Sequence, residues 1–142
     1  RRSARSHVFI WLATIFCSVY FQSWLPILFI VLPNFYGKTL VMLMGLTQHA
    51  GLQEDVKDHR LSTRTVYLNP IFSFLYWNME YHVEHHMFPQ VPSYNLKRLH
   101  VLIKDQTPAA RKGLWGAYKE IVPALFKQAK DPDYKIPLTV PG

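Results

Sequence analysis

Three histidines in the second half of the chain have the residue type and spacing of a metal site. His82, His85 and His86 form the pattern HxxHH, and positions i, i+3 and i+4 share one face of a helix. Imidazole is the commonest metal ligand, and three imidazoles buried without partners are costly. The spacing predicts a helix whose histidines converge on a metal ion, with Asn78 one turn earlier on the same face. The alternative is a surface cluster that is merely rich in histidine.

The surrounding residues narrow the choice of metal. Glu84 lies between the histidines, so the segment matches neither the HExxH nor the HxxEH pattern of zinc proteases. A zinc finger is excluded because the single cysteine, Cys17, lies in an apolar region. A histidine-rich site without thiolate suits redox-active iron better than structural zinc.

A long apolar segment must hold such a site near a membrane. Residues 6–37 contain no Lys, Arg, Asp or Glu, and a bilayer crossing needs roughly 20 apolar residues. We predict a helical hairpin with its turn near Ser23–Pro26, which returns the chain to its starting side. The alternative is one span with a turn at Pro33–Gly37.

The remaining chain is predicted to be helical and to lie outside the lipid. Residues 48–65 are polar, and residues 66–77 are apolar but too short for a span, which is typical of an interfacial or re-entrant element. Amphipathic helices are expected at 96–104 and at 113–128, the second kinked or divided by Pro123. The proline-rich tail should be extended or disordered.

These elements predict an all-α fold, a transmembrane helical hairpin followed by cytosolic amphipathic helices that carry the histidine pattern. We divide the chain into a membrane hairpin (1–47), a histidine-bearing cytosolic region (48–112) and a C-terminal helix with its tail (113–142). The chain has no initiator Met and begins with two arginines, from which we expect it to be the C-terminal part of a longer protein.

The net charge of +7 and the pI near 9.6 do not indicate nucleic-acid binding. Arg1, Arg2 and Arg5 adjoin the start of the apolar run, and basic residues beside a span are expected on the cytosolic side of a membrane. A nucleic-acid-binding domain would not carry 32 consecutive uncharged, largely apolar residues. We therefore expect a multi-pass membrane protein with its histidines on the cytosolic side.

Residues 78–89, NMEYHVEHHMFP, with Val91 and Pro92 after them, closely resemble the last histidine box of the membrane fatty acid desaturase family. Residues 47–51, TQHAG, resemble the segment in which these enzymes place one further iron-binding histidine. The stretch from Asp58 to Thr65 resembles a connector of the carotenoid ketolase and rhizopine-catabolism oxygenase branches. The resemblance covers roughly residues 1–105.

The resemblance implies a site and a reaction. His49, His82, His85 and His86 match iron ligands. Asn78, Glu84 and His59 are candidates for the shell around them, whereas His100 is expected at the surface and His7 at the membrane interface. Family members use two non-haem iron ions and O₂ as co-substrate to cleave a C–H bond of a lipid acyl chain. Their partners are membrane lipid, a fatty acyl or other lipophilic substrate, and an electron donor such as ferredoxin or cytochrome b5.

The chain also departs from the family pattern. Desaturases carry two further boxes before this one, HxxxH or HxxxxH and a separate HxxHH, and neither precedes residue 78 in this chain, so we expect this chain alone to be incomplete and inactive. A hydroxylase or ketolase acting on a small molecule or carotenoid is an alternative, because its oxidant is the same. A non-catalytic, membrane-anchored metal-binding subunit is the alternative from another class.

Overall fold

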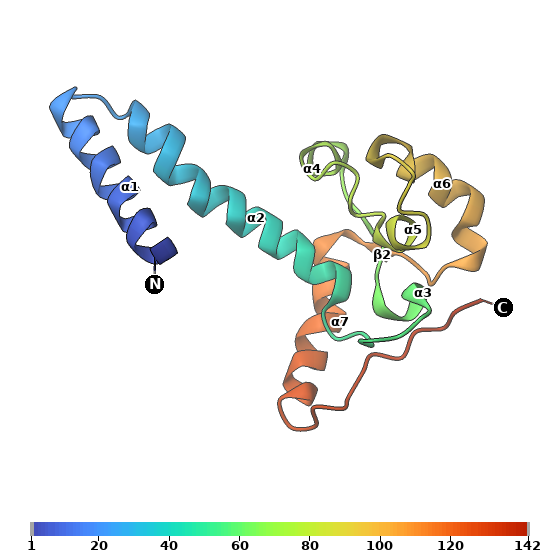
Figure 1. Cartoon of the computed structure of the whole chain (residues 1–142). Coiled ribbons are helices and arrows are strands. Elements are labelled where there is room, and N and C mark those ends of the chain that lie inside the picture. Colours follow the sequence, from blue (N-terminus) through green and yellow to red (C-terminus); the bar gives the residue numbers. More distant parts are fainter. Residues whose placement is uncertain (1, 142) are drawn as a thin grey trace. The chain divides into compact units, whose positions relative to one another are not determined.

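A computed structural model describes residues 2–141, so Arg1, the first of the basic residues before the apolar run, lies outside it. The chain divides into two compact units, Arg1–Met42 and Leu43–Gly142, each described by itself below. The prediction of an all-α fold is confirmed, since the strands among the described residues are two pairs of residues, in β1 (Val66–Tyr67) and β2 (Arg111–Lys112). Figure 1 shows the elements in chain order.

The first unit is a helical hairpin. Helix α1 (Arg2–Tyr20) ends in a turn at residues 21–23, where Gln22 adopts a positive φ of 47°. The chain then forms the π-helical turn η1 (Ile27–Val31) and enters α2 (Leu32–His49). The rings of Trp11 and Phe35 lie 6.2 Å apart across the hairpin. The reversal lies where the hairpin prediction placed it, and the alternative turn at Pro33–Gly37 is wrong, because these residues are helical.

The π-helical turn explains how the second helix passes Pro33 without a break. A proline ring clashes with the carbonyl of residue i−4, and here that residue, Phe29, lies in the wider turn η1. The most apolar 18-residue window of the continuous segment Ile27–His49 has a mean hydropathy of 1.7, and 6% of that window is buried. Among the described residues this segment is the one helix long and apolar enough to cross a membrane.

The second unit is built from short helices joined by ordered loops. After α2 come α3 (His59–Ser62), β1, α4 (Pro70–Leu75) and α5 (His82–Met87). They are followed by η2 (Ser93–Asn95), α6 (Leu96–Ile103), η3 (Lys104–Gln106), β2 and α7 (Gly113–Gln128). Strands β1 and β2 pair in parallel, with Val66 opposite Arg111. Helix α5 contacts both α3 and α6.

Helix α7 supplies much of the core of this unit. Ala117 and Ile121 pack on Val66, and Ala124 packs on Leu52 and Ile136. Of the two outcomes predicted for Pro123, a kink or a division, the division does not occur, because α7 is continuous through this residue. The tail is extended, as predicted, and it is held in place where the N–H of Ile136 donates to the carbonyl of Gly51 at 2.8 Å.

Candidate metal centre

Helix α5 brings two of the predicted ligands onto one side. It begins at His82, and the backbone N–H of His85 donates to the carbonyl of Tyr81 at 3.1 Å, which closes its first turn. The Nε2 atoms of His82 and His86 lie 3.0 Å apart. Because residues four apart face the same way in a helix, the spacing predicted this pair.

The third nitrogen comes from the end of α2. His49 is the last residue of that helix, and its Nε2 lies 2.8 Å from Nε2 of His82. One ligand nitrogen from each of His49, His82 and His86 lies within 4.8 Å of the others. We call these three side chains the histidine centre.

The hydrogen bonds of the centre leave ring nitrogens free for a cation. Nδ1 of His49 lies 2.9 Å from the carbonyl of Ser62, so it carries the proton and its Nε2 presents a lone pair. Such an outer hydrogen bond is the usual way a ligand imidazole is oriented. Nδ1 of His82 is buried and has no hydrogen-bond partner among the described residues. A neutral imidazole carries a single N–H, so His82 cannot donate a hydrogen bond to both His49 and His86.

The distances fit a single ion. Two nitrogens bound at right angles, each about 2.1 Å from one metal ion, lie about 3 Å apart. The separations of 2.8 Å and 3.0 Å agree with that value. The nitrogens of the third pair, His49 and His86, lie within 4.8 Å of each other, so the three imidazoles converge on the place of a single metal ion.

Burial keeps His82 and His86 neutral and ready to bind a metal ion. The pKa of His82 is lowered to about 3. Burial is the largest cause, followed by the neighbouring side chains of His86, His49 and His85. Burial and the nearby His49 and His59 also lower the pKa of His86. At neutral pH these imidazoles carry no proton that a metal ion would have to displace from the ligand lone pair.

Two further histidines stand close to the centre. The ring of His85 lies 5.8 Å from the rings of both His82 and His86. The ring of His59, on α3, lies 5.2 Å from that of His86. Neither belongs to the group of three converging nitrogens. His85, which was predicted to converge with His82 and His86, therefore lies beside the centre, and so does His59, which was expected in the surrounding shell.

Glu84 has a different neighbour from the one we expected. It is fully buried. One carboxylate oxygen lies 2.5 Å from Nδ1 of His100, and the other accepts from the hydroxyl of Thr65 at 2.6 Å. Glu84 thus orients the imidazole of His100 instead of that of a candidate ligand.

His100 was expected at the surface, and this is wrong: it is 6% exposed. Leu96, His100 and Ile103 are the buried residues of α6 and stand at helical spacing. That periodicity was a signal in the sequence that this histidine belongs to the apolar face.

The prediction that Asn78 shares a face with the ligand histidines is also wrong. Trp77 and Asn78 both have positive φ, 58° and 54°, and the helix begins only at His82. The Asn78 side chain instead accepts a hydrogen bond from Ser73 at 3.1 Å. The left-handed turn therefore separates Asn78 from the helical face.

No sequence pattern indicated the role of Arg64, which fixes the end of α2. The side chain is 3% exposed, and its Nη1 donates to the carbonyl of Thr47 at 2.7 Å. Both Nη atoms also reach the carbonyl of Ala50, at 3.4 and 3.3 Å. These carbonyls lie on either side of His49 and belong to the helix end, where carbonyls lack partners within the helix. Glu120 of α7 pairs with Arg64 at 3.3 Å.

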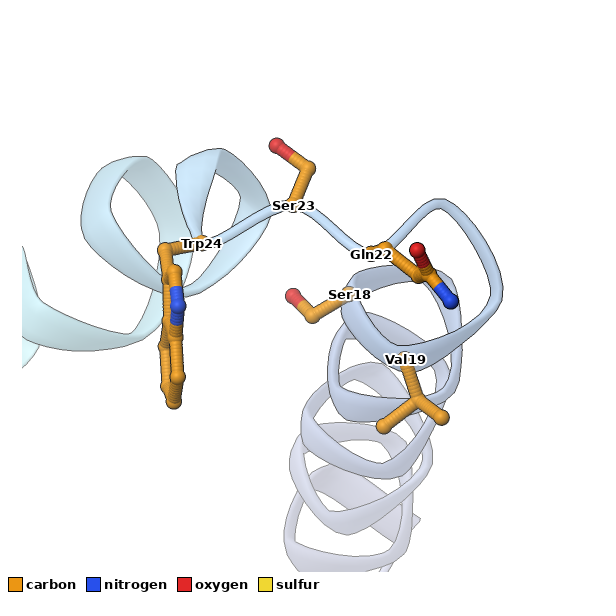
Figure 2. Close-up of a pocket in the computed structure, with 5 residues that line it drawn as sticks. All are labelled: Ser18, Val19, Gln22, Ser23 and Trp24. Atoms are coloured by element: carbon orange, nitrogen blue, oxygen red, sulfur yellow. The ribbon is translucent and has the colours of Figure 1, made fainter.

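A pocket at the turn of the hairpin has a different character. It encloses about 290 Å³ and is lined by Ser18, Val19, Gln22, Ser23 and Trp24. Figure 2 shows these side chains around the turn. None of them titrates near neutral pH or is a common metal ligand, so the histidine centre is the stronger candidate for catalysis.

Comparison with known proteins identifies the family. The model of the family described as fatty acid desaturase matches residues 1–118. The chain belongs to the fatty acid desaturase family. No curated protein and no solved structure matches the chain.

Membership of the fatty acid desaturase family gives the centre its context. This is a family of membrane-bound oxidoreductases that use iron, and the apolar helix Ile27–His49 fits a membrane-bound protein. The matched residues include every histidine of the centre. The resemblance noted in the sequence is thereby confirmed at the level of the family.

Proposed function

We propose that this chain forms the iron-binding part of a membrane-bound desaturase that uses O₂ to remove hydrogen from a lipid acyl chain. The observation that carries the proposal is the convergence of three imidazole nitrogens, from His49, His82 and His86, within 4.8 Å. Iron bound there would supply the oxidising chemistry with O₂ that an unactivated C–H bond requires.

In this proposal the side chains of the centre hold iron and set its surroundings. His82 is a neutral ligand because its burial excludes a proton, and His49 is held in register by Ser62. His85 projects beside the pair on α5 and offers a nitrogen to the second ion of a two-iron centre. Since four histidines do not complete two iron ions, we expect further ligands from outside this set and no turnover by the chain alone.

The surroundings suit a lipophilic substrate and a soluble electron donor. Large apolar side chains of the hairpin, such as Phe9, Phe29 and Val41, are exposed, as expected of a surface that faces lipid. Lys97, Arg98 and Lys104 lie on or next to α6, which contacts the ligand helix. These cations would steer an acidic donor such as ferredoxin or cytochrome b5, with the centre on the cytosolic side of a multi-pass protein.

The test is metal binding by the chain in detergent. Iron(II) is added without oxygen, and the iron retained after gel filtration is measured and examined by Mössbauer spectroscopy. We expect His82→Ala to abolish retention. The matched control is His7→Ala, because His7 is an exposed histidine of α1 that contacts the carbonyl of Ser3. Iron retained equally by His82→Ala would overturn the proposal.

A hydroxylase or ketolase of a small molecule or carotenoid is the second candidate. Residues 58–65, which resemble a connector of those branches, meet residues 47–51 beside the centre, where the N–H of Arg64 donates to the carbonyl of Gln48 at 2.8 Å. Product analysis after expression with acyl and carotenoid substrates separates the two candidates, since hydroxylation adds oxygen to the product and desaturation does not.

A further inference from the structure

A hydrogen-bonded chain of three side chains runs beside the histidine centre and includes none of the proposed ligands. The hydroxyl of Tyr67 lies 2.7 Å from Nε2 of His100. Nδ1 of the same imidazole lies 2.5 Å from Glu84, whose other oxygen accepts from Thr65. This hydrogen-bonded network runs from Tyr67, which is 40% exposed, to the carboxylate of Glu84, which is fully buried.

The partners fix where the protons lie. Glu84 accepts from Thr65 and is an acceptor toward His100, so the imidazole carries its proton on Nδ1. Nε2 of His100 then has a free lone pair, and Tyr67 donates its phenolic proton to it. Burial and Glu84 raise the pKa of Tyr67, which keeps the phenol protonated at neutral pH. The arrangement is a hydroxyl with a base beside it and a carboxylate behind the base.

The charge balance prepares His100 to take that proton. Within the described part of the chain, the one ion-pair partner of the Glu84 carboxylate is His100. A buried carboxylate without a cation is costly. A proton arriving at Nε2 would make His100 an imidazolium directly against Glu84, so the positive charge would be compensated where it forms.

A second tyrosine links these hydrogen-bonded side chains to the histidine centre. The ring of Tyr81 lies 6.4 Å from that of Tyr67 and 5.3 Å from that of His100. Tyr81 is 8% exposed and directly precedes His82 in the chain. Its hydroxyl makes no hydrogen bond to an acceptor among residues 2–141. The ring of Tyr81 therefore lies where it can pass an electron between Tyr67 and the histidine centre, but no base stands beside its hydroxyl to accept the proton.

We propose that Tyr67 is a redox-active tyrosine that sends an electron through Tyr81 toward the histidine centre and its proton to His100. In this step Tyr67 loses one electron to a strong one-electron oxidant. The phenolic O–H bond breaks, the proton binds Nε2 of His100, and a neutral tyrosyl radical remains. A soluble one-electron reductant such as ascorbate returns the electron at the exposed ring, and the proton returns from His100.

The step would protect the protein from oxidation. A centre that attacks C–H bonds must hold a strong oxidant, which damages its own ligands when no substrate is bound. An electron from Tyr67 would remove that oxidising power and leave the radical where soluble reductants reach it. This role rests on the proposed function, whereas the ability of Tyr67 to be oxidised with proton transfer to His100 does not.

The first experiment uses the metal-free chain in detergent. Flash-generated ruthenium(III) tris-bipyridine is the oxidant, and tyrosyl formation is followed by transient absorption and by electron paramagnetic resonance. We expect a fast phase with a solvent deuterium isotope effect. Tyr67→Phe should abolish this phase, and His100→Gln should slow it roughly 100-fold, the lower end of what a positioned base supplies.

Tyr94→Phe is the matched control. Tyr94 is more exposed than Tyr67, at 72%, and its hydroxyl makes no hydrogen bond to the described residues. We expect the fast phase to survive this change. A fast phase that persists in Tyr67→Phe would overturn the proposal. An unchanged rate in His100→Gln would also overturn it. If His100→Gln does not fold, the result with Tyr67→Phe alone decides.

A second experiment tests the link to the centre. Iron-loaded chain is treated with hydrogen peroxide, and oxidised tyrosines are located by mass spectrometry. We expect modification at Tyr67 and a severalfold loss of it in Tyr81→Phe. Equal modification of Tyr94 and Tyr67 would contradict a directed path. Failure to bind iron would instead count against the proposed function, and the metal-free experiment would still decide the chemistry of Tyr67.

Discussion

The Nε2 atoms of His49 and His82 lie 2.8 Å apart, although 33 positions separate the two residues in the chain. One comes from the end of a long apolar helix and the other from the first position of a helix of six residues. The packing that brings α2 and α5 together therefore builds the centre. Any change that shifts the end of α2 should be felt by a bound metal ion.

Metal binding should stabilise the second unit. An ion that binds only the folded state adds about 2.7 kcal/mol at a concentration one hundred times its dissociation constant. Cobalt(II) is a suitable probe, because its absorption reports the ligand set while thermal unfolding reports stability. We expect stabilisation in the unaltered chain and little in His49→Ala. Equal stabilisation of both would show that the ion binds elsewhere.

Arg64→Met should destabilise the protein and weaken metal binding together. The change removes the donors for the carbonyls of Thr47 and Ala50 and one cation from Glu120, at a cost of about 3 kcal/mol. Chemical unfolding and cobalt titration measure the two effects. Arg98→Met, at an exposed position of α6, is the control and should change neither. A normal cobalt affinity in Arg64→Met would mean that His49 is held without this arginine.

Gly51→Ala should destabilise the contact between the tail and the core. Gly51 has a φ of +77°, and a Cβ there would lie 2.7 Å from Cδ1 of Ile136. The strained backbone and the overpacked contact cost about 2 kcal/mol together. Gly116→Ala is the matched control, because a Cβ at that helical position meets nothing within 4 Å. It should stabilise the helix by about 0.5 kcal/mol. Thermal unfolding of the two variants should therefore shift in opposite directions.

Acid should weaken the attachment of α7 through Glu120. The hydrogen bond from Arg111 and the charge of Arg64 hold the pKa of Glu120 below its ordinary value of 4.5. A depressed carboxyl pKa stabilises the folded state fully above the unfolded value and loses that effect as pH falls through the folded value. The free energy of unfolding should therefore decline on acidification below about pH 4.5.

Glu120→Gln tests this assignment. The variant should be less stable than the unaltered chain at neutral pH, and its acid decline should be shallower, because the titrating group is gone. Urea unfolding followed by circular dichroism between about pH 6 and about pH 3 measures both. An unchanged acid decline would assign the effect to other carboxyl groups.

The sequence by itself determined the local features of this protein. The uncharged run of residues 6–37 and its prolines predicted the hairpin and its turn. The HxxHH spacing predicted one helical face for His82, His85 and His86, of which His82 and His86 belong to the converging group. Both results depend on hydropathy and on the helical repeat, which act over a few residues. The family followed from the same short segments, because a ligand spacing is a local pattern.

Only the tertiary structure decided which side chains meet across elements. The end of α3 orients His49, α6 supplies the imidazole that Glu84 holds, and Arg64 binds α2 and α7 together. The position of Asn78 was decided by two consecutive left-handed residues, which no periodicity reports. These contacts depend on packing between segments far apart in the chain, where burial forces each polar group to find a partner that the local pattern does not specify.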